Sequence, residues 1–134
     1  MNQYVLDSYA MIAFFEDEPG AEQVTGVLQQ LIMKKASGFM SVINWGEIYY
    51  TTMREQGAET AEKVMNQFTK YPVQLVEADK AQTYEAAKLK AEYRIAYADC
   101  FAAALAIKLK APLVTGDPEF KKLEDRITVQ WIDE

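Results

Sequence analysis

The chain has 134 residues, with 14 Lys and Arg against 20 Asp and Glu, a formal net charge of −6, one Cys and no His. Its length is typical of one domain, and its composition, half apolar and one quarter charged, is that of an ordinary globular protein. The absence of His excludes His-ligated metal centres and imidazole catalysis, and a single Cys excludes internal disulfides and Cys-ligated clusters. The acidic balance argues against nucleic-acid binding by bulk positive charge, but it does not exclude a metal-dependent nuclease.

The first residues contain neither a basic segment nor a long apolar core, so we expect no signal peptide. The most apolar stretch, residues 100–107, is far shorter than the ~20 residues that a membrane-spanning helix needs. We therefore expect one domain over residues 1–134, located in the cytoplasm and not associated with a membrane.

Apolar runs and helical spacings alternate along the whole chain. In chain order, the sequence predicts a strand over 4–6, helices over 8–15 and 21–35, a strand over 39–41, helices over 42–56 and 60–70, a strand over 73–76, helices over 80–93 and 98–109, and strands over 112–115 and 127–132. Ser37 and Gly38 are predicted to be a break before the second strand, and a turn is predicted over residues 116–118. This alternation predicts a layered α/β domain with a mainly parallel sheet.

Four carboxylates follow these predicted strands. Asp7 comes directly after the first strand, and Asp117 lies two residues beyond the fourth. Glu47 is near the start of the helix after the second strand, and Asp99 opens the apolar helix before the fourth. Because functional groups in open parallel sheets gather beyond the C-terminal ends of the strands, these acids can meet at one edge.

Each acid also has a purely structural interpretation. Asp7, and Asp117 before Pro118, are typical helix caps, while Asp99 is favoured by the helix dipole in a first turn. Glu47 lies among apolar residues, where a carboxylate is unfavourable unless a cation binds it, although a solvated helix face remains an alternative.

The four acids together indicate a metal site. Crowded carboxylates repel each other and become protonated, whereas a divalent cation favours their ionised forms. Oxygen ligands without His or Cys are typical of Mg²⁺ or Mn²⁺. Such a site is suited to the hydrolysis of phosphodiester bonds by an activated water, which needs no His.

Four segments in this order carry a resemblance to a known family: residues 4–10 (YVLDSYA), 44–50 (NWGEIYY), 97–106 (YADCFAAALA) and 113–120 (LVTGDPEF). The chain resembles a PIN domain, specifically the VapC-type toxin ribonucleases of bacterial and archaeal toxin–antitoxin pairs. The resemblance spans essentially the whole chain and implies a three-layer α/β/α fold with a five-stranded sheet. It also implies an RNA substrate, a VapB-type antitoxin as partner and a homodimer.

The resemblance assigns roles to particular residues. It implies that Asp7, Glu47, Asp99 and Asp117 surround the Mg²⁺ or Mn²⁺, and that hydroxyls and an amide support them, namely Ser8, Thr115 and Asn44. For these three residues, capping is the alternative. Glu119 is either part of a second, looser metal position or a solvated acid.

Other residues leave alternatives open. Trp45, Tyr49, Tyr50 and Met53 are predicted to be core residues, with an antitoxin-binding surface as the alternative, and Cys100 is predicted to be a small core residue. Several basic residues are solvated charges or contacts to an RNA backbone: Lys34, Lys35, Arg54, Arg94, Lys121 and Lys122.

Two other classes of phosphoryl-transfer protein do not fit the sequence. A phosphatase of the haloacid dehalogenase type needs a second Asp where this chain has Tyr9, and a receiver domain needs paired acids at the first strand. A catalytically silent PIN scaffold that binds protein or RNA remains the alternative.

Overall fold

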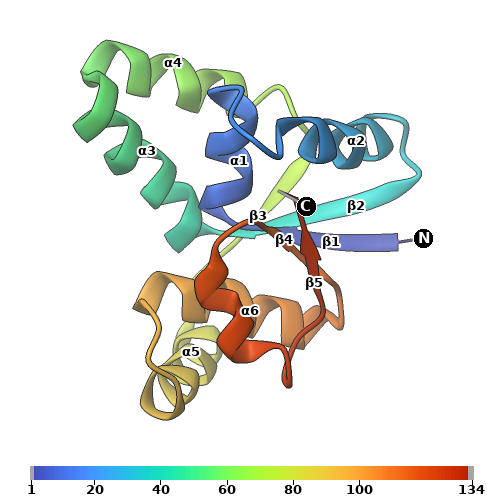
Figure 1. Ribbon diagram of the computed structural model, residues 1–134, viewed down its shortest axis with the longest axis vertical. Coiled ribbons are helices and arrows are strands. Elements are labelled where there is room, and N and C mark those ends of the chain that lie inside the picture. The colour runs from blue at the N-terminus through green and yellow to red at the C-terminus, as the bar shows by residue number, and fades with distance from the viewer. Residues whose placement is uncertain (1, 133–134) are drawn as a thin grey trace.

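The structure is a computed structural model that describes residues 2–132. Its five strands form one sheet in the order β3-β2-β1-β4-β5, and all four neighbouring pairs are parallel (Figure 1). The strands are β1 (Asn2–Leu6), β2 (Ala36–Ser41), β3 (Val73–Val76), β4 (Leu113–Thr115) and β5 (Val129–Trp131). The predicted parallel five-stranded sheet is confirmed.

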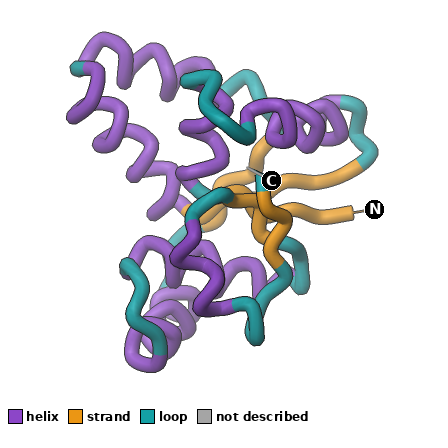
Figure 2. The backbone as a smooth tube through the Cα atoms, in the orientation of Figure 1, coloured by secondary structure: helices purple, strands orange, loops and turns teal. Residues whose placement is uncertain are grey.

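Helices cover both faces of the sheet, which gives three layers (Figures 1 and 2). One layer contains α1 (Ser8–Phe15), α2 (Ala21–Ile32), α3 (Val42–Gln56) and α4 (Ala58–Phe68). The other contains α5 (Lys80–Glu92), α6 (Tyr97–Leu109) and the short 3-10 helix η1 (Pro118–Leu123). The predicted α/β/α architecture is therefore confirmed.

The central strand β1 joins two hydrophobic cores. Leu6 belongs to the core beneath α1 and α2, whereas Val5 belongs to the core beneath α5 and α6. This alternation follows from the two-residue period of a strand that is covered on both faces. In α6, small side chains from Cys100 to Ala106 are buried, so the helix packs closely on the sheet and positions Asp99 at its start.

Some predicted element bounds were wrong. Ser37 and Gly38 lie inside β2, paired with Gln3 and Tyr4 of β1, rather than in a break before the strand. The helix predicted over 21–35 ends at Ile32. The capping interpretation of Asp117 before Pro118 indicated where η1 begins, but the helix itself was not among the predicted elements.

The prediction that the large side chains of α3 are core residues was wrong for three of the four. Trp45, Tyr50 and Met53 are exposed by 37%, 44% and 42%, and Tyr49 is half-buried. Only one side of α3 contacts the rest of the fold, and its outer turns project with α4 beyond the sheet (Figure 1). Cys100 is buried, as predicted.

Within residues 2–132, no helix has both the length and the apolar character that crossing a membrane requires.

Candidate metal-dependent nuclease site

The four predicted acids come together at the C-terminal edge of the sheet. Asp7 follows β1, Asp117 follows β4, Glu47 lies in the second turn of α3, and Asp99 lies in the first turn of α6. All four line one pocket of about 240 Å³. Strands β2 and β4 lie on opposite sides of β1, so the strand order reverses between β1 and β4, and open α/β sheets bind their ligands at such a reversal.

Asp7 is the most buried of these acids, with 3% of its surface exposed. Its Oδ1 accepts a hydrogen bond from the Ala10 amide at 2.9 Å, so it caps α1 as predicted. Its Oδ2 accepts a hydrogen bond from the fully buried Thr115 hydroxyl at 2.5 Å. Burial raises the pKa of Asp7 to about 8 despite these donors, and the negative charges of Asp99 and Asp117 add to the rise.

Thr115 couples the acids of β1 and β4. While its hydroxyl donates to Asp7, its oxygen accepts a hydrogen bond from the Asp117 amide at 3.1 Å. Asp117 in turn caps η1 by accepting a hydrogen bond from the Glu119 amide at 3.0 Å. The capping and site interpretations of Asp7 and Asp117 are thus compatible, because each carboxylate caps a helix and also lines the pocket.

Polar side chains from two helices hold Glu47. Its Oε1 accepts hydrogen bonds from the Ser8 hydroxyl at 2.9 Å and from the Asn44 amide at 3.0 Å. Its Oε2 accepts one longer hydrogen bond, of 3.4 Å, from the Tyr50 hydroxyl. The supporting residues predicted from the sequence therefore contact the predicted acids, with Ser8 and Asn44 on Glu47 and Thr115 on Asp7.

Asp99 experiences the charges of the other acids. Burial, together with the negative charges of Asp117, Glu47 and Glu119, raises the pKa of Asp99 to about 7. Glu119 does not line the pocket but forms an ion pair with Lys122 at 3.3 Å. The raised pKa values of Asp7 and Asp99 show that negative charge at this site lacks compensation from the protein.

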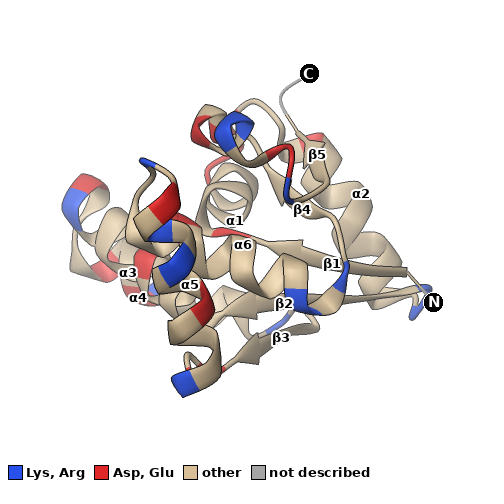
Figure 3. Ribbon diagram, turned by 90° about the horizontal axis from the view of Figure 1, so that it is seen from below, with Lys and Arg blue, Asp and Glu red and all other residues tan. Residues whose placement is uncertain are grey.

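The pocket is more acidic than the sequence predicted. Glu18 and Glu55 also line it, and none of its ten lining residues is Lys or Arg. Nothing in the sequence around Glu18 indicates that it belongs to the site. For Glu55 there is a signal, because Glu47, Thr51 and Glu55 are spaced four residues apart and therefore lie on one side of α3. Figure 3 shows acidic and basic segments interspersed on α3, α4 and α5, without a continuous basic face in that view.

The donor set fits a hard divalent cation. In the described part of the chain, no three acidic or Cys side chains already stand close enough together to hold a metal ion. Mg²⁺, however, usually takes only one or two carboxylates and keeps several waters, so it does not need a preformed cage. A cation would supply the positive charge that Asp7 and Asp99 lack, and it would favour their ionised forms.

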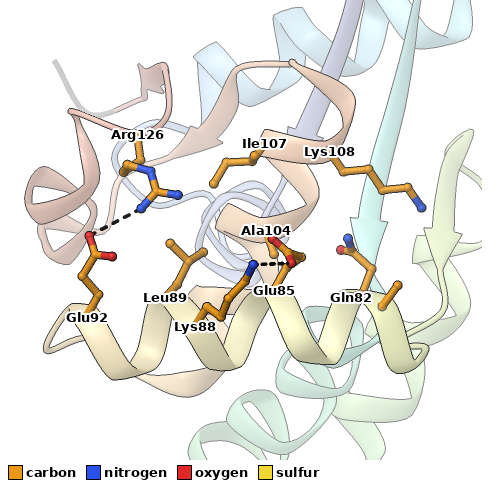
Figure 4. Close-up of a pocket in the computed structure, with 10 residues that line it drawn as sticks. Gln82, Glu85, Lys88, Leu89, Glu92, Ala104, Ile107, Lys108 and Arg126 are labelled. Carbon is orange, nitrogen blue, oxygen red and sulfur yellow. Dashed lines mark hydrogen bonds and ion pairs between the residues drawn. The ribbon is translucent and has the colours of Figure 1, made fainter.

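A larger groove of about 530 Å³ lies between α5 and α6 (Figure 4). Leu89 and Ala104 form part of its lining, and charged residues also line it, including the ion pairs Lys88–Glu85 and Arg126–Glu92. Most of its charged groups form ion pairs and it contains none of the predicted acids, so the smaller acidic pocket is the better candidate for chemistry.

An acidic pocket at the point where the strand order of a parallel α/β sheet reverses has the place and the oxygen donors suited to metal-assisted hydrolysis of phosphate esters. The PIN domain family model matches residues 4–126, so this chain belongs to the PIN domain family. A search of curated proteins finds no match.

Solved structures of VapC toxins and their complexes have the same fold. A chain of VapBC2 from Rickettsia felis, bound to a DNA fragment from their promoter, has a TM-score of 0.76 at 20% identity, over 96% of this chain and 97% of that one. A chain of VapBC-1 from nontypeable Haemophilus influenzae has a TM-score of 0.71 at 21% identity, over 98% of this chain and 99% of that one. VapC20 of Mycobacterium tuberculosis, a toxin that cleaves the sarcin-ricin loop, has a TM-score of 0.71 at 13% identity, over 88% of this chain and 92% of that one.

Proposed function

We propose that this chain is a metal-dependent endoribonuclease and the toxin of a toxin–antitoxin pair. The observation that carries the proposal is the convergence of Asp7, Glu47, Asp99 and Asp117 on one pocket that has no basic lining residue. Membership of the PIN domain family and the fold shared with VapC toxins support it.

The four acids are the residues proposed to hold Mg²⁺ or Mn²⁺, one or two of them by direct contact and the others through its waters. When bound, such a cation orients the scissile phosphate, lowers the pKa of the attacking water and offsets charge on the leaving oxygen. The protein's own contribution is to hold the carboxylates in place: Thr115 orients Asp7, while Ser8 and Asn44 orient Glu47. Because Asp7 and Asp117 follow the paired strands β1 and β4, the sheet brings these two carboxylates to the same edge.

We propose RNA as the substrate and a VapB-type antitoxin as the partner. The similar structures from Rickettsia felis and Haemophilus influenzae are VapBC complexes, which supports an antitoxin for this chain as well. A homodimer and action in the cytoplasm are further parts of the proposal. Sequencing of RNA 5′ ends after induced expression would identify the substrate, because each cleavage creates a new end.

The test is RNA cleavage with Mn²⁺ or Mg²⁺ by the wild-type protein and by Asp7→Asn and Asp99→Asn. We expect both substitutions to abolish cleavage, because each removes a charged ligand. Asp79→Asn is the matched control, since Asp79 caps α5 outside the pocket and its substitution should leave cleavage unchanged. Cleavage that persists in both variants would contradict the proposal. Failure of the wild-type protein to bind Mn²⁺ would instead favour the silent PIN scaffold.

A further inference from the structure

The side-chain amide of Gln82 is almost buried and has no hydrogen-bond partner among residues 2–132. Gln82 lies in the first turn of α5, where its backbone amide is bonded to the capping residue Asp79, and it is 5% exposed. Its side chain lines the groove between α5 and α6 and points into it (Figure 4). Because an almost buried amide without partners is unfavourable for folding, this amide favours a role in binding a ligand in the groove.

The groove combines apolar surface with available positive charge. Leu89, Ala104 and Ile107 supply apolar lining, and Lys108 lies across the groove from Gln82 (Figure 4). Lys108 forms no ion pair within the described part of the chain. The other charged side chains of the groove form the two ion pairs already described, so Lys108 remains available there for an acidic group.

The groove continues along the C-terminal end of α6 into a second hollow of about 480 Å³. The two hollows share Ile107 and Arg126, and the second adds Lys110. Lys110 is exposed and forms no ion pair with another described residue. Four basic and two acidic side chains line the two hollows together, although the whole chain has a net charge of −6. Such an elongated surface is complementary to a chain segment with acidic and apolar side chains.

The amide of Gln82 favours a peptide in an extended conformation as this segment. A Gln side chain has a donor and an acceptor, and so has each peptide unit. A helix satisfies its own backbone groups, whereas an extended segment presents them to its partner. RNA fits less well, because no aromatic side chain lines either hollow to stack on a base.

We propose that this groove binds an extended peptide segment of a partner protein. The backbone of the segment pairs with the amide of Gln82, its apolar side chains pack on Leu89 and Ile107, and an acidic side chain contacts Lys108. The groove shares no lining residue with the acidic pocket. The inference therefore goes beyond the proposed nuclease function and does not depend on it.

The test starts from a random heptapeptide library displayed on phage and selected on the wild-type protein. We expect enriched peptides with acidic and apolar residues, whose affinity is then measured by fluorescence anisotropy. Gln82→Leu should weaken binding about 10-fold, because it keeps the apolar surface but leaves the backbone of the peptide without a partner. Lys108→Glu should also weaken binding, because repulsion replaces attraction. Lys70→Glu is the matched control, since Lys70 is exposed and lines neither hollow.

Losses of affinity in Gln82→Leu and Lys108→Glu, with none in Lys70→Glu, would support the proposal. A selection that enriches no common peptide, or peptides that bind all variants equally, would overturn it. A single-stranded RNA oligonucleotide, tested with a chelator present, could instead lose affinity for Lys108→Glu and not for Lys70→Glu; that result would assign the groove to RNA and overturn the proposal. If Gln82→Leu does not fold, Gln82→Met takes its place. RNA cleavage should be unchanged in all these variants, so the outcome leaves the proposed function to its own test.

Discussion

Replacement of Asp7 by Asn should stabilise the metal-free protein at neutral pH while it abolishes the proposed activity. Asp7 is almost fully buried beside two other acids, and its pKa is raised from an ordinary value of 3.8 to about 8. Between these pH values the folded chain binds a proton that the unfolded chain does not, so stability falls as the pH rises. Asn removes this titration.

The magnitude follows from the pKa. Each pH unit between 3.8 and 7 lowers the free energy of unfolding by about 1.4 kcal/mol, which gives about 4 kcal/mol at pH 7. Asn cannot reproduce both hydrogen bonds that Asp7 accepts, from Ala10 and Thr115, and the loss of one costs about 1–2 kcal/mol. The net gain at pH 7 is about 2 kcal/mol, or about 7 °C in Tm for a domain of this size. The difference should change sign near pH 5.

Urea or thermal unfolding at pH 4 and pH 7, with a chelator present, tests this directly. Asp7→Asn should be less stable than the wild type at pH 4 and more stable at pH 7. Asp79→Asn is the control, because Asp79 caps α5 from an exposed position and its loss should bring no gain as the pH rises. Added Mn²⁺ should stabilise the wild type more than Asp7→Asn. An equal loss of stability in Asp7→Asn at both pH values would refute the reasoning.

Three further predictions concern the site and the fold. Mn²⁺ affinity should rise from pH 6 to pH 8, because the raised pKa values of Asp7 and Asp99 require these carboxyls to release protons when the cation binds. Calorimetry in two buffers of different ionisation enthalpy measures the released protons. An affinity that does not change with pH would contradict this prediction. Thr115→Val removes a hydroxyl that lowers the pKa of Asp7, so the acid limb of the pH–rate profile should move to higher pH, and an unmoved limb would count against this role. Gly20→Ala should destabilise the fold by about 2–3 kcal/mol in urea unfolding, because a Cβ there would lie 2.7 Å from an isoleucine side chain at a φ of +98°. Gly57→Ala has a similar φ of +91° but open space, so its loss should be smaller, and equal losses would show that the close contact is unimportant.

Most of the fold could be predicted from local signals in the sequence. The helices over 8–15 and 42–56 and the strand over 73–76 have the predicted bounds, because capping residues and Pro72 mark their ends. The start of β2 could not be predicted, since Ser37 and Gly38 are ordinary turn residues in isolation. Their strand conformation depends on pairing with Gln3 and Tyr4 of β1, which lie more than 30 residues away in the chain.

The candidate site could be predicted only in part. The positions of the four acids after predicted strands were sufficient to group them, because parallel strands bring their C-terminal ends to one edge. The contacts between them could not be read from the sequence. Ser8 meets Glu47 across 39 residues, and Asn44 meets Ala98 across 54, so these pairs depend on how α1, α3 and α6 pack. The exposure of Trp45 likewise depends on the direction of α3, which residue type does not determine.

Much of the net negative charge of the chain is concentrated at the acidic pocket. The four proposed ligands account for four of the six net negative charges, and Glu18 and Glu55 line the same pocket. A sequence selected for stability alone would not bury Asp7 beside Asp99 and Asp117, because burial, and to a smaller extent the charges of these two acids, raise the pKa of Asp7 and oppose folding at neutral pH. The hydrogen bonds from Ala10 and Thr115 offset only part of this cost. Binding of the proposed cation would release the remaining unfavourable energy, so the burial and repulsion that weaken the metal-free fold would contribute to metal affinity.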